Sequence, residues 1–254
     1  MYFDTHAHYD DDRFDDDRDE LLGSMPGAGV ELIMNCACSL GTSKFGLGLA
    51  EKYPFVYFSV GVHPHDSKEM DDDTAYELEK LLSHPKAVAV GEIGLDYHYD
   101  FSPRDVQKKR FREQLALALR VKKPVIIHMR EATRDTLDII GEFSGLTGVF
   151  HCFPGSWETA KALLDMGWYL SFTGVITFKN ARKSLEVIEK MPADRLMLET
   201  DCPYMAPEPV RGRRNSSLFL PYIAEKVAQI RGITKEEAAA LTTENGRRFF
   251  GIGA

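Results

Sequence analysis

The chain has 254 residues, enough to bury one large core. Its 31 Lys and Arg residues against 39 Asp and Glu residues give a formal net charge of −8, which argues against a protein that coats nucleic acid through bulk electrostatics. An acidic amino terminus, no long apolar run and no disulfide framework among four cysteines predict a cytoplasmic protein without a membrane partner.

Short runs rich in Val, Ile, Phe and Tyr alternate with amphipathic stretches along the whole chain. This alternation is typical of βαβ units around a parallel sheet. We expect eight strands, at residues 2–5, 30–35, 56–60, 87–90, 125–127, 148–150, 168–172 and 196–198. The sequence therefore predicts one α/β domain over residues 1–254, a single (β/α)8 TIM barrel with its site at the C-terminal face of the strands.

Helices are expected between the strands and at the end of the chain. Phe111, Leu115 and Leu119 recur at helical spacing within residues 106–122, and Pro124 then stops the helix. Two further helices are expected at 218–231 and 236–250, the second with a capping box formed by Thr234 and Glu237. The acidic stretch 10–20 reads as a solvated loop and helix start.

Side chains of metal-ligand type follow the predicted strands. His6 and His8 follow the first strand, and the others follow the fourth, fifth, sixth and eighth strands, namely Glu92, His128, His151 and Asp201. In a (β/α)8 barrel these strand ends open onto one face, so residues far apart in sequence converge on one pocket. We therefore expect these six residues to form a divalent-metal site.

The types and spacing of these residues favour a catalytic metal site. Positions i and i+2 of an extended chain point to the same side, so His6 and His8 can hold one ion. Imidazole and carboxylate ligands together suit zinc, manganese or a related divalent ion, and the identity stays open. The neighbouring thiols of Cys152 and Cys202 are expected to point away from the site, and Cys36 and Cys38 to pack in the core.

The motifs DTHAHYD, GVHPH, VGEIGLDYH, PVIIHMREA, HCFPGS and LETDCPYMAPEP occur in this order along nearly the whole chain. In these motifs the chain resembles the TatD family of metal-dependent deoxyribonucleases, within the amidohydrolase-like metal barrels. The resemblance implies two divalent ions, Mg, Mn or Zn, with Glu92 bridging them. It implies that His6, His8 and Asp201 complete the first site, and that His128 and His151 complete the second. It also implies a role for His63 and His65 near the substrate phosphate, although Pro64 could equally make GVHPH a simple turn.

The resemblance implies hydrolysis of phosphodiester bonds in DNA, with Asp201 and Glu92 as catalytic residues and Asp201 as the proton acceptor. Local cations could offset the negative net charge, and we favour Arg130 and Arg211 for binding substrate. Aromatic side chains beside the motifs could stack on bases, with Phe153 the one expected in the core, and they are Tyr97, Tyr99, Phe153, Trp157 and Tyr204. We therefore expect a 3'-5' exonuclease acting on single-stranded or frayed DNA.

Two alternatives stay open. The same ligands could serve hydrolysis of an ester or amide, such as an aminoacyl ester, in a tight and mostly neutral pocket. The chain could also be a non-catalytic binding protein with structural metals, but six ligand-type residues exceed the four that close a structural zinc site. The oligomeric state and any protein partner cannot be predicted from the sequence.

Overall fold

The computed structural model describes residues 1–253. Eight strands form one sheet in the order β1 to β8, and helices alternate with them along the chain, so the fold is a (β/α)8 barrel. The chain divides into two compact units, one made of residues 1–35 with 152–254 and the other of residues 36–151. The predicted fold class is confirmed. The prediction of one domain over residues 1–254 stays a prediction.

The first unit contains both ends of the chain. Within it β1 pairs with β2 and β7 with β8, all in parallel, and Ala7 bridges Cys202 in parallel beyond β8. Its strands are β1 (Tyr2–Ala7), β2 (Val30–Asn35), β7 (Tyr169–Phe172) and β8 (Leu196–Leu198). Its helices are η1 (Asp12–Phe14), α1 (Arg18–Ser24), η2 (Pro26–Ala28), α6 (Trp157–Asp165), η4 (Gly174–Thr177), α7 (Arg182–Lys190), η5 (Ala193–Arg195), η6 (Ser217–Phe219), α8 (Leu220–Arg231) and α9 (Lys235–Phe250).

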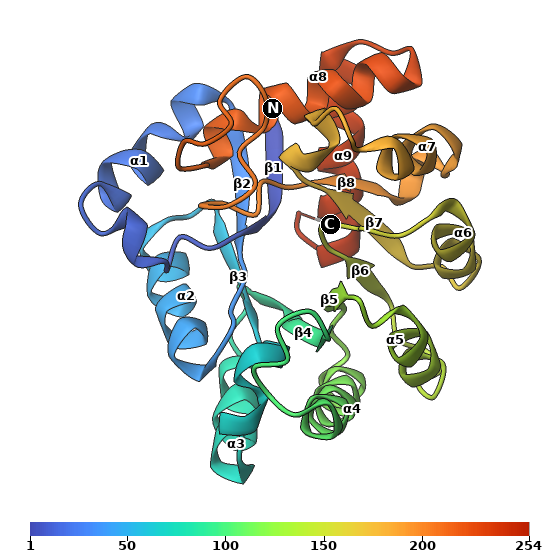
Figure 1. Ribbon diagram of the computed structural model, residues 1–254. Coiled ribbons are helices and arrows are strands. Elements are labelled where there is room, and N and C mark those ends of the chain that lie inside the picture. The colour runs from blue at the N-terminus through green and yellow to red at the C-terminus, as the bar shows by residue number, and fades with distance from the viewer. Residues whose placement is uncertain (254) are drawn as a thin grey trace. The chain divides into compact units, whose positions relative to one another are not determined.

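The second unit carries four strands, and the pairs β3–β4, β4–β5 and β5–β6 are parallel. Helices α2 to α5 flank these strands (Figure 1), and α2 packs on β3 while α4 packs on β4. The strands are β3 (Val56–Val60), β4 (Ala87–Asp96), β5 (Val125–Arg130) and β6 (Gly148–Phe150). The helices are α2 (Leu40–Lys52), η3 (Pro64–Glu69), α3 (Asp72–Leu81), α4 (Arg104–Val121) and α5 (Thr133–Ile140).

Three strands extend further toward their C-terminal ends than the sequence predicts. Strand β1 runs to Ala7, β4 to Asp96 and β5 to Arg130, whereas the apolar runs had suggested ends at 5, 90 and 127. His6, Glu92 and His128 therefore lie within strands rather than after them, which corrects the prediction. The reason is that polar ligand residues and glycines break the apolar pattern while the ladder of backbone hydrogen bonds continues.

The predicted helices are confirmed with small shifts at their ends. Helix α4 begins at Arg104 and ends at Val121, and Lys122 follows in the left-handed conformation. The capping box of α9 forms as expected: the Glu237 amide donates to Thr234 Oγ1, and the Thr234 amide donates to the Glu237 carboxylate. The acidic stretch forms the short helix η1 and the start of α1.

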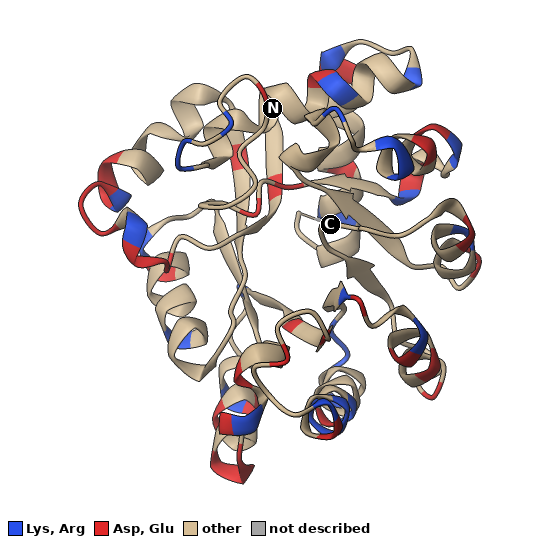
Figure 2. Ribbon diagram, in the orientation of Figure 1, with Lys and Arg blue, Asp and Glu red and all other residues tan. Residues whose placement is uncertain are grey.

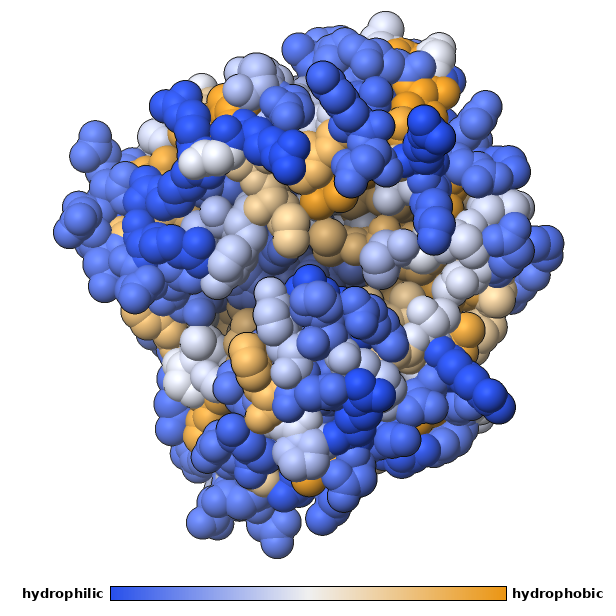
Figure 3. All heavy atoms as spheres, viewed as in Figure 1, coloured by the Kyte–Doolittle hydropathy of each residue, from blue (hydrophilic) through white to orange (hydrophobic). Residues whose placement is uncertain are grey.

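Charged side chains cover the helices with both signs mixed. Acidic residues predominate on α3 and basic residues on α4, with both signs present on each helix (Figure 2), and Arg120 of α4 pairs with Glu79 of α3 at 2.7 Å. The face drawn in Figure 3 is mostly hydrophilic, with scattered apolar side chains. Neither unit presents a helix of uniformly basic character in these views. Within residues 1–253 no helix combines the length and apolarity needed to cross a bilayer.

Two helical glycines make a matched test of how α9 is seated on β1. A Cβ at Gly246 would lie 2.7 Å from the buried Phe3 ring, whereas a Cβ at exposed Gly48 in α2 would meet nothing within 4 Å. We expect Gly246→Ala to lower the free energy of unfolding by about 1–3 kcal/mol through overpacking. We expect Gly48→Ala to raise it by about 0.5–1 kcal/mol through helix propensity. Urea unfolding of both variants checks the pair, and equal effects would contradict this packing.

Candidate metal centre

The first unit gathers two imidazoles and a carboxylate at the end of β1, called here the histidine-pair cluster (His6, His8 and Asp201). The Asp201 amide donates to the His6 carbonyl at 2.9 Å, and the His8 amide donates to the Cys202 carbonyl at 2.8 Å, so the segment after β8 runs beside β1. The Nε2 atoms of His6 and His8 lie 3.1 Å apart, and Asp201 Oδ1 lies 3.4 Å from His8 Nε2. Donors about 2.1 Å from one tetrahedral ion would be separated by roughly 3.4 Å, so this donor set fits a divalent metal.

The second unit gathers donors from within β4 and β5 and from the position after β6, called here the glutamate cluster (Glu92, His128 and His151). Glu92 Oε1 lies 2.9 Å from His128 Nδ1 and 2.8 Å from His151 Nε2. The two imidazole nitrogens are 3.2 Å apart. The three donor atoms therefore lie close enough together to share one ion, as in the first unit. A carboxylate with two imidazoles again fits a divalent ion.

Gly94 lets the two strands of the glutamate cluster approach each other closely. It lies opposite His128 in the β4–β5 ladder, and its φ is 141°. A Cβ there would come within 3.0 Å of the His128 backbone, and its φ is one that L side chains rarely adopt. Gly94 therefore sets the separation between β4, which contains Glu92, and β5, which contains His128.

Asp96 orients His128, a role that was not predicted from the sequence. Its Oδ2 accepts a hydrogen bond from His128 Nε2 at 3.1 Å, so His128 presents Nδ1 to Glu92 and His151. The same oxygen lies 3.0 Å from His65 Nε2, while Oδ1 accepts the amides of His98 and Tyr99. Alternation along β4 could have found this residue, because positions 92 and 96 share a face of the strand.

Burial and pairing act in opposite directions on the ionisable groups of the second unit. Burial lowers the pKa of His63 to about 4, although Glu92 acts to raise it. Burial also lowers the pKa of His128, but hydrogen bonds to Asp96 and Glu92 outweigh it and leave that pKa raised. Burial acts to raise the pKa of Asp96, and bonds from His128, the Tyr99 amide and His65 overcome it and hold the carboxyl ionised. The unit thus keeps a carboxylate beside each of these imidazoles.

Asp4 stabilises the histidine-pair cluster through hydrogen bonds to neighbouring residues, and this role was not predicted from the sequence. Its carboxylate accepts the Thr200 amide at 2.9 Å, the Thr200 hydroxyl at 2.5 Å and the Ser217 hydroxyl at 2.6 Å. Complete burial raises its pKa to about 7 despite these bonds. Asp4 thereby holds the residue that precedes Asp201, two positions before His6 on the same face of β1.

The residues predicted to bind substrate fall into different surroundings. His63 Nε2 faces Glu92 Oε1 at 3.4 Å, and its Nδ1 accepts the His65 amide, so the GVHPH segment both caps η3 and borders the glutamate cluster. Arg130 lies over the Tyr99 ring. The Tyr97 hydroxyl instead donates to Asp135 at 2.5 Å. Arg211 stacks on Phe178 and lies 3.8 Å from Glu208.

Two of the cysteines, Cys36 and Cys202, and the ring of Phe153 are buried, as predicted from the sequence. Cys36 and Cys202 are buried, and burial raises the pKa of Cys202 to about 12. Cys38 is half-buried with its thiol 4.0 Å from Glu92, so it borders the glutamate cluster in addition to packing. Phe153 is buried against Phe172, as expected of a core residue.

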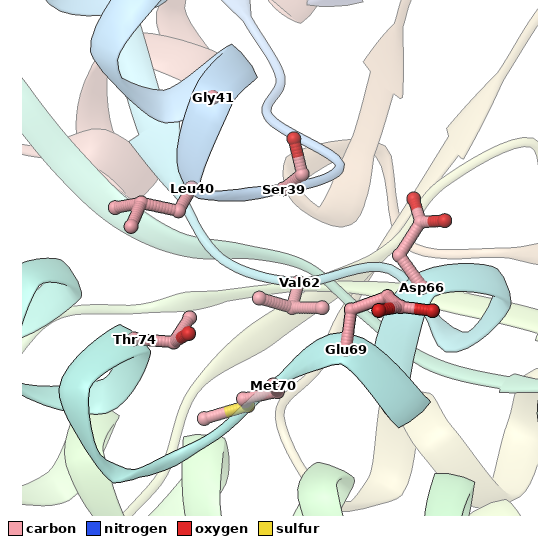
Figure 4. A pocket seen from close by; sticks show the side chains of 8 residues that line it. All are labelled: Ser39, Leu40, Gly41, Val62, Asp66, Glu69, Met70 and Thr74. Carbon is pink, nitrogen blue, oxygen red and sulfur yellow. The ribbon is translucent and has the colours of Figure 1, made fainter.

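A pocket of about 180 Å³ lies elsewhere in the second unit, between α2, η3 and α3 (Figure 4). Leu40, Val62 and Met70 form its apolar part, and the carboxylates of Asp66 and Glu69 lie at its rim. None of the residues predicted to bind metal or substrate lines it. The predicted chemistry therefore does not involve this pocket.

Asp96 is not among the predicted metal ligands, but it accepts a hydrogen bond from the predicted ligand His128. A substitution of Asp96 should therefore weaken metal binding. We expect Asp96→Asn to weaken zinc binding by the glutamate cluster about 10–100-fold, because such outer partners fix the ring orientation and basicity of a ligating histidine. Competition with a chromophoric chelator measures this affinity. The control Asp100→Asn removes an exposed carboxylate that pairs with Arg104 and should leave the affinity unchanged. Equal affinities in the two variants would contradict the role of Asp96.

Comparison with known proteins shows the family to which the chain belongs. A family model described as TatD related DNase matches residues 3–251. The metal-dependent hydrolase YabD of Bacillus subtilis is 43% identical over 254 residues, covering 99% of this chain and 100% of YabD. A protein of Cronobacter turicensis named 3'-5' ssDNA/RNA exonuclease TatD is 37% identical over 257 residues, covering 98% of this chain and 97% of its own. The crystal structure of the TatD homolog YjjV from Escherichia coli superposes with a TM-score of 0.91 at 31% identity, covering 98% of each chain. The chain belongs to the TatD family of metal-dependent hydrolases.

Proposed function

We propose that the chain is a deoxyribonuclease that removes nucleotides from the 3' end of single-stranded or frayed DNA. The observation that carries the proposal is the glutamate cluster, in which a buried carboxylate and two imidazoles converge within 3.2 Å with His63 beside them. The similarity to TatD related DNases and to the Cronobacter protein named 3'-5' ssDNA/RNA exonuclease TatD supports DNA as the substrate.

We assign one divalent ion to the histidine-pair cluster and one to the glutamate cluster, with Glu92 as the shared ligand that the family resemblance implies. Such ions would supply Lewis-acid activation of a water and neutralise charge that develops on the phosphate. Magnesium, manganese and zinc are the candidates.

The side chains of the chain have separate roles in this proposal. Asp201 accepts the proton of the attacking water, since its carboxylate is held beside His8 by the backbone bond to His6. His63 is neutral at physiological pH because its pKa is low, so it can donate one hydrogen bond to a phosphate oxygen without adding charge. Arg130 supplies a cation near the glutamate cluster. His65, Tyr97 and Arg211 stay proposed substrate contacts.

We also assign the chain to the cytoplasm, on the ground that its four cysteines form no disulfide.

The test is a time course of a labelled single-stranded DNA oligomer with metal-stripped protein that is resupplied with magnesium, manganese or zinc. We expect stepwise shortening of a 5'-labelled strand only when an ion is present. Glu92→Gln should lower the rate by at least about 100-fold, because it removes the charge that the two imidazoles share. Glu142→Gln, which alters an exposed carboxylate paired with Arg112, is the matched control and should cut normally.

The same preparations are tested on an amino acid ester and on a small amide. Cleavage of either substrate by a protein that leaves DNA intact with every ion would replace the nuclease with the ester or amide hydrolase. Shortening of DNA that persists in Glu92→Gln would overturn the assigned centre.

A further inference from the structure

Two aromatic rings are stacked on each other in the loop that follows β4, in the second unit. Tyr99 and Phe101 have ring centroids 5.1 Å apart with an interplanar angle of 15°. Their side chains are 47% and 56% exposed, so the pair does not belong to the core. An exposed contiguous apolar surface of this kind marks a binding site more often than an isolated exposed ring does.

Arg130, the last residue of β5, adds a cation to the pair. Its guanidinium carbon lies 4.8 Å from the Tyr99 centroid. The acidic neighbours have other partners, since Asp100 pairs with Arg104 at 2.7 Å and Glu131 lies 2.8 Å from His98. Over residues 1–253 Arg130 forms no ion pair, so its charge is available to a phosphate.

His65 connects this group to the glutamate cluster. The His65 centroid lies 5.4 Å from that of Tyr99 and 4.8 Å from that of Phe101, at steep angles to both, so the His65 ring contacts the pair edge-to-face, while Phe101 stays 56% exposed. Its Nε2 lies 3.0 Å from Asp96 Oδ2, the oxygen that also holds His128. Two side chains, His65 and Asp96, therefore connect the exposed rings to the predicted metal ligand His128.

We propose that Tyr99, Phe101 and Arg130 form a nucleotide subsite, called here the aromatic platform. A nucleobase stacks on the outer face of Phe101, and Arg130 binds the adjoining phosphate, next to the bond that is cut. The inference rests on the proposed nuclease function and gives it a base-binding residue. Stacking tolerates any base, which suits an enzyme that shortens a strand regardless of its sequence.

A double-mutant cycle between protein and DNA tests the platform. Phe101→Leu keeps an apolar side chain but removes the ring face, and single-stranded oligomers carry an abasic tetrahydrofuran residue at one of the three 3'-terminal positions. Binding is measured by fluorescence anisotropy with metal-free protein, and cleavage of the same oligomers is followed with the active ion. Tyr76→Leu, at an exposed aromatic residue of α3, is the matched control.

We expect Phe101→Leu to lower the affinity for the intact oligomer about 10-fold, within the range of base–aromatic stacking. At one position the abasic oligomer should bind the wild type about 10-fold more weakly than the intact oligomer, and Phe101→Leu should then cause no further loss. Equal losses for intact and abasic oligomers, no loss, or the same loss with Tyr76→Leu would overturn the platform.

Arg130→Gln adds an independent readout. The magnitude of the slope of log affinity against log salt should fall by about 0.7 when a single phosphate contact to single-stranded DNA is removed. An unchanged slope would remove Arg130 from the platform.

Binding separates failure of the platform from failure of the nuclease. If the wild type binds the oligomer but cuts it with no ion, the proposed function is wrong, and the coupling in affinity still decides the platform. If the wild type binds neither oligomer, the platform is wrong as a base site, whatever the protein hydrolyses.

Discussion

An ionised carboxylate buried in an apolar barrel costs several kcal/mol unless cations or hydrogen-bond donors surround it. Glu92 is only 2% exposed, and its Oε1 meets imidazoles from β5 and β6 and from the segment after β3. The arrangement of the second unit follows from this constraint. Gly94 brings β4 close enough to β5, and Asp96 turns His128 so that Nδ1 rather than Nε2 faces Glu92.

The first unit meets the same constraint in another way. Asp4 is fully buried and is satisfied by hydroxyls and an amide instead of imidazoles. Those bonds tie Thr200 and Ser217 to β1, and Asn215 binds the Thr200 carbonyl from the other side. Asp201 is held within this frame with a φ of 56°, a left-handed conformation that Asp tolerates better than most residues. The loop that carries Asp201, a predicted ligand, is thus anchored by these hydrogen bonds.

The positions of the ligands could be predicted from the sequence because barrel strands are apolar and their C-terminal ends are not. In the sequence the run VAVG is followed by Glu92 and the run PVII by His128. Strands were predicted at both places, as the structure has them. The residues that orient the ligands were not identified. In the sequence Asp4 and Asp96 cannot be distinguished from other acidic residues of strands. Their role depends on hydrogen-bond partners that are distant in sequence. Strand ends were set too early at β1, β4 and β5 for the same reason, since pairing continues through polar residues. The contact between Arg130 at the end of β5 and Tyr99 in the loop after β4 depends on tertiary structure alone.

The central claim is that the two clusters hold the divalent ions of a hydrolase. Anomalous diffraction from crystals grown with manganese or zinc tests it most directly, because the ion is located without assuming a substrate. We expect one peak bounded by His6, His8 and Asp201, and a second bounded by Glu92, His128 and His151. Peaks confined to surface acids, with both clusters empty at saturating metal, would contradict the account.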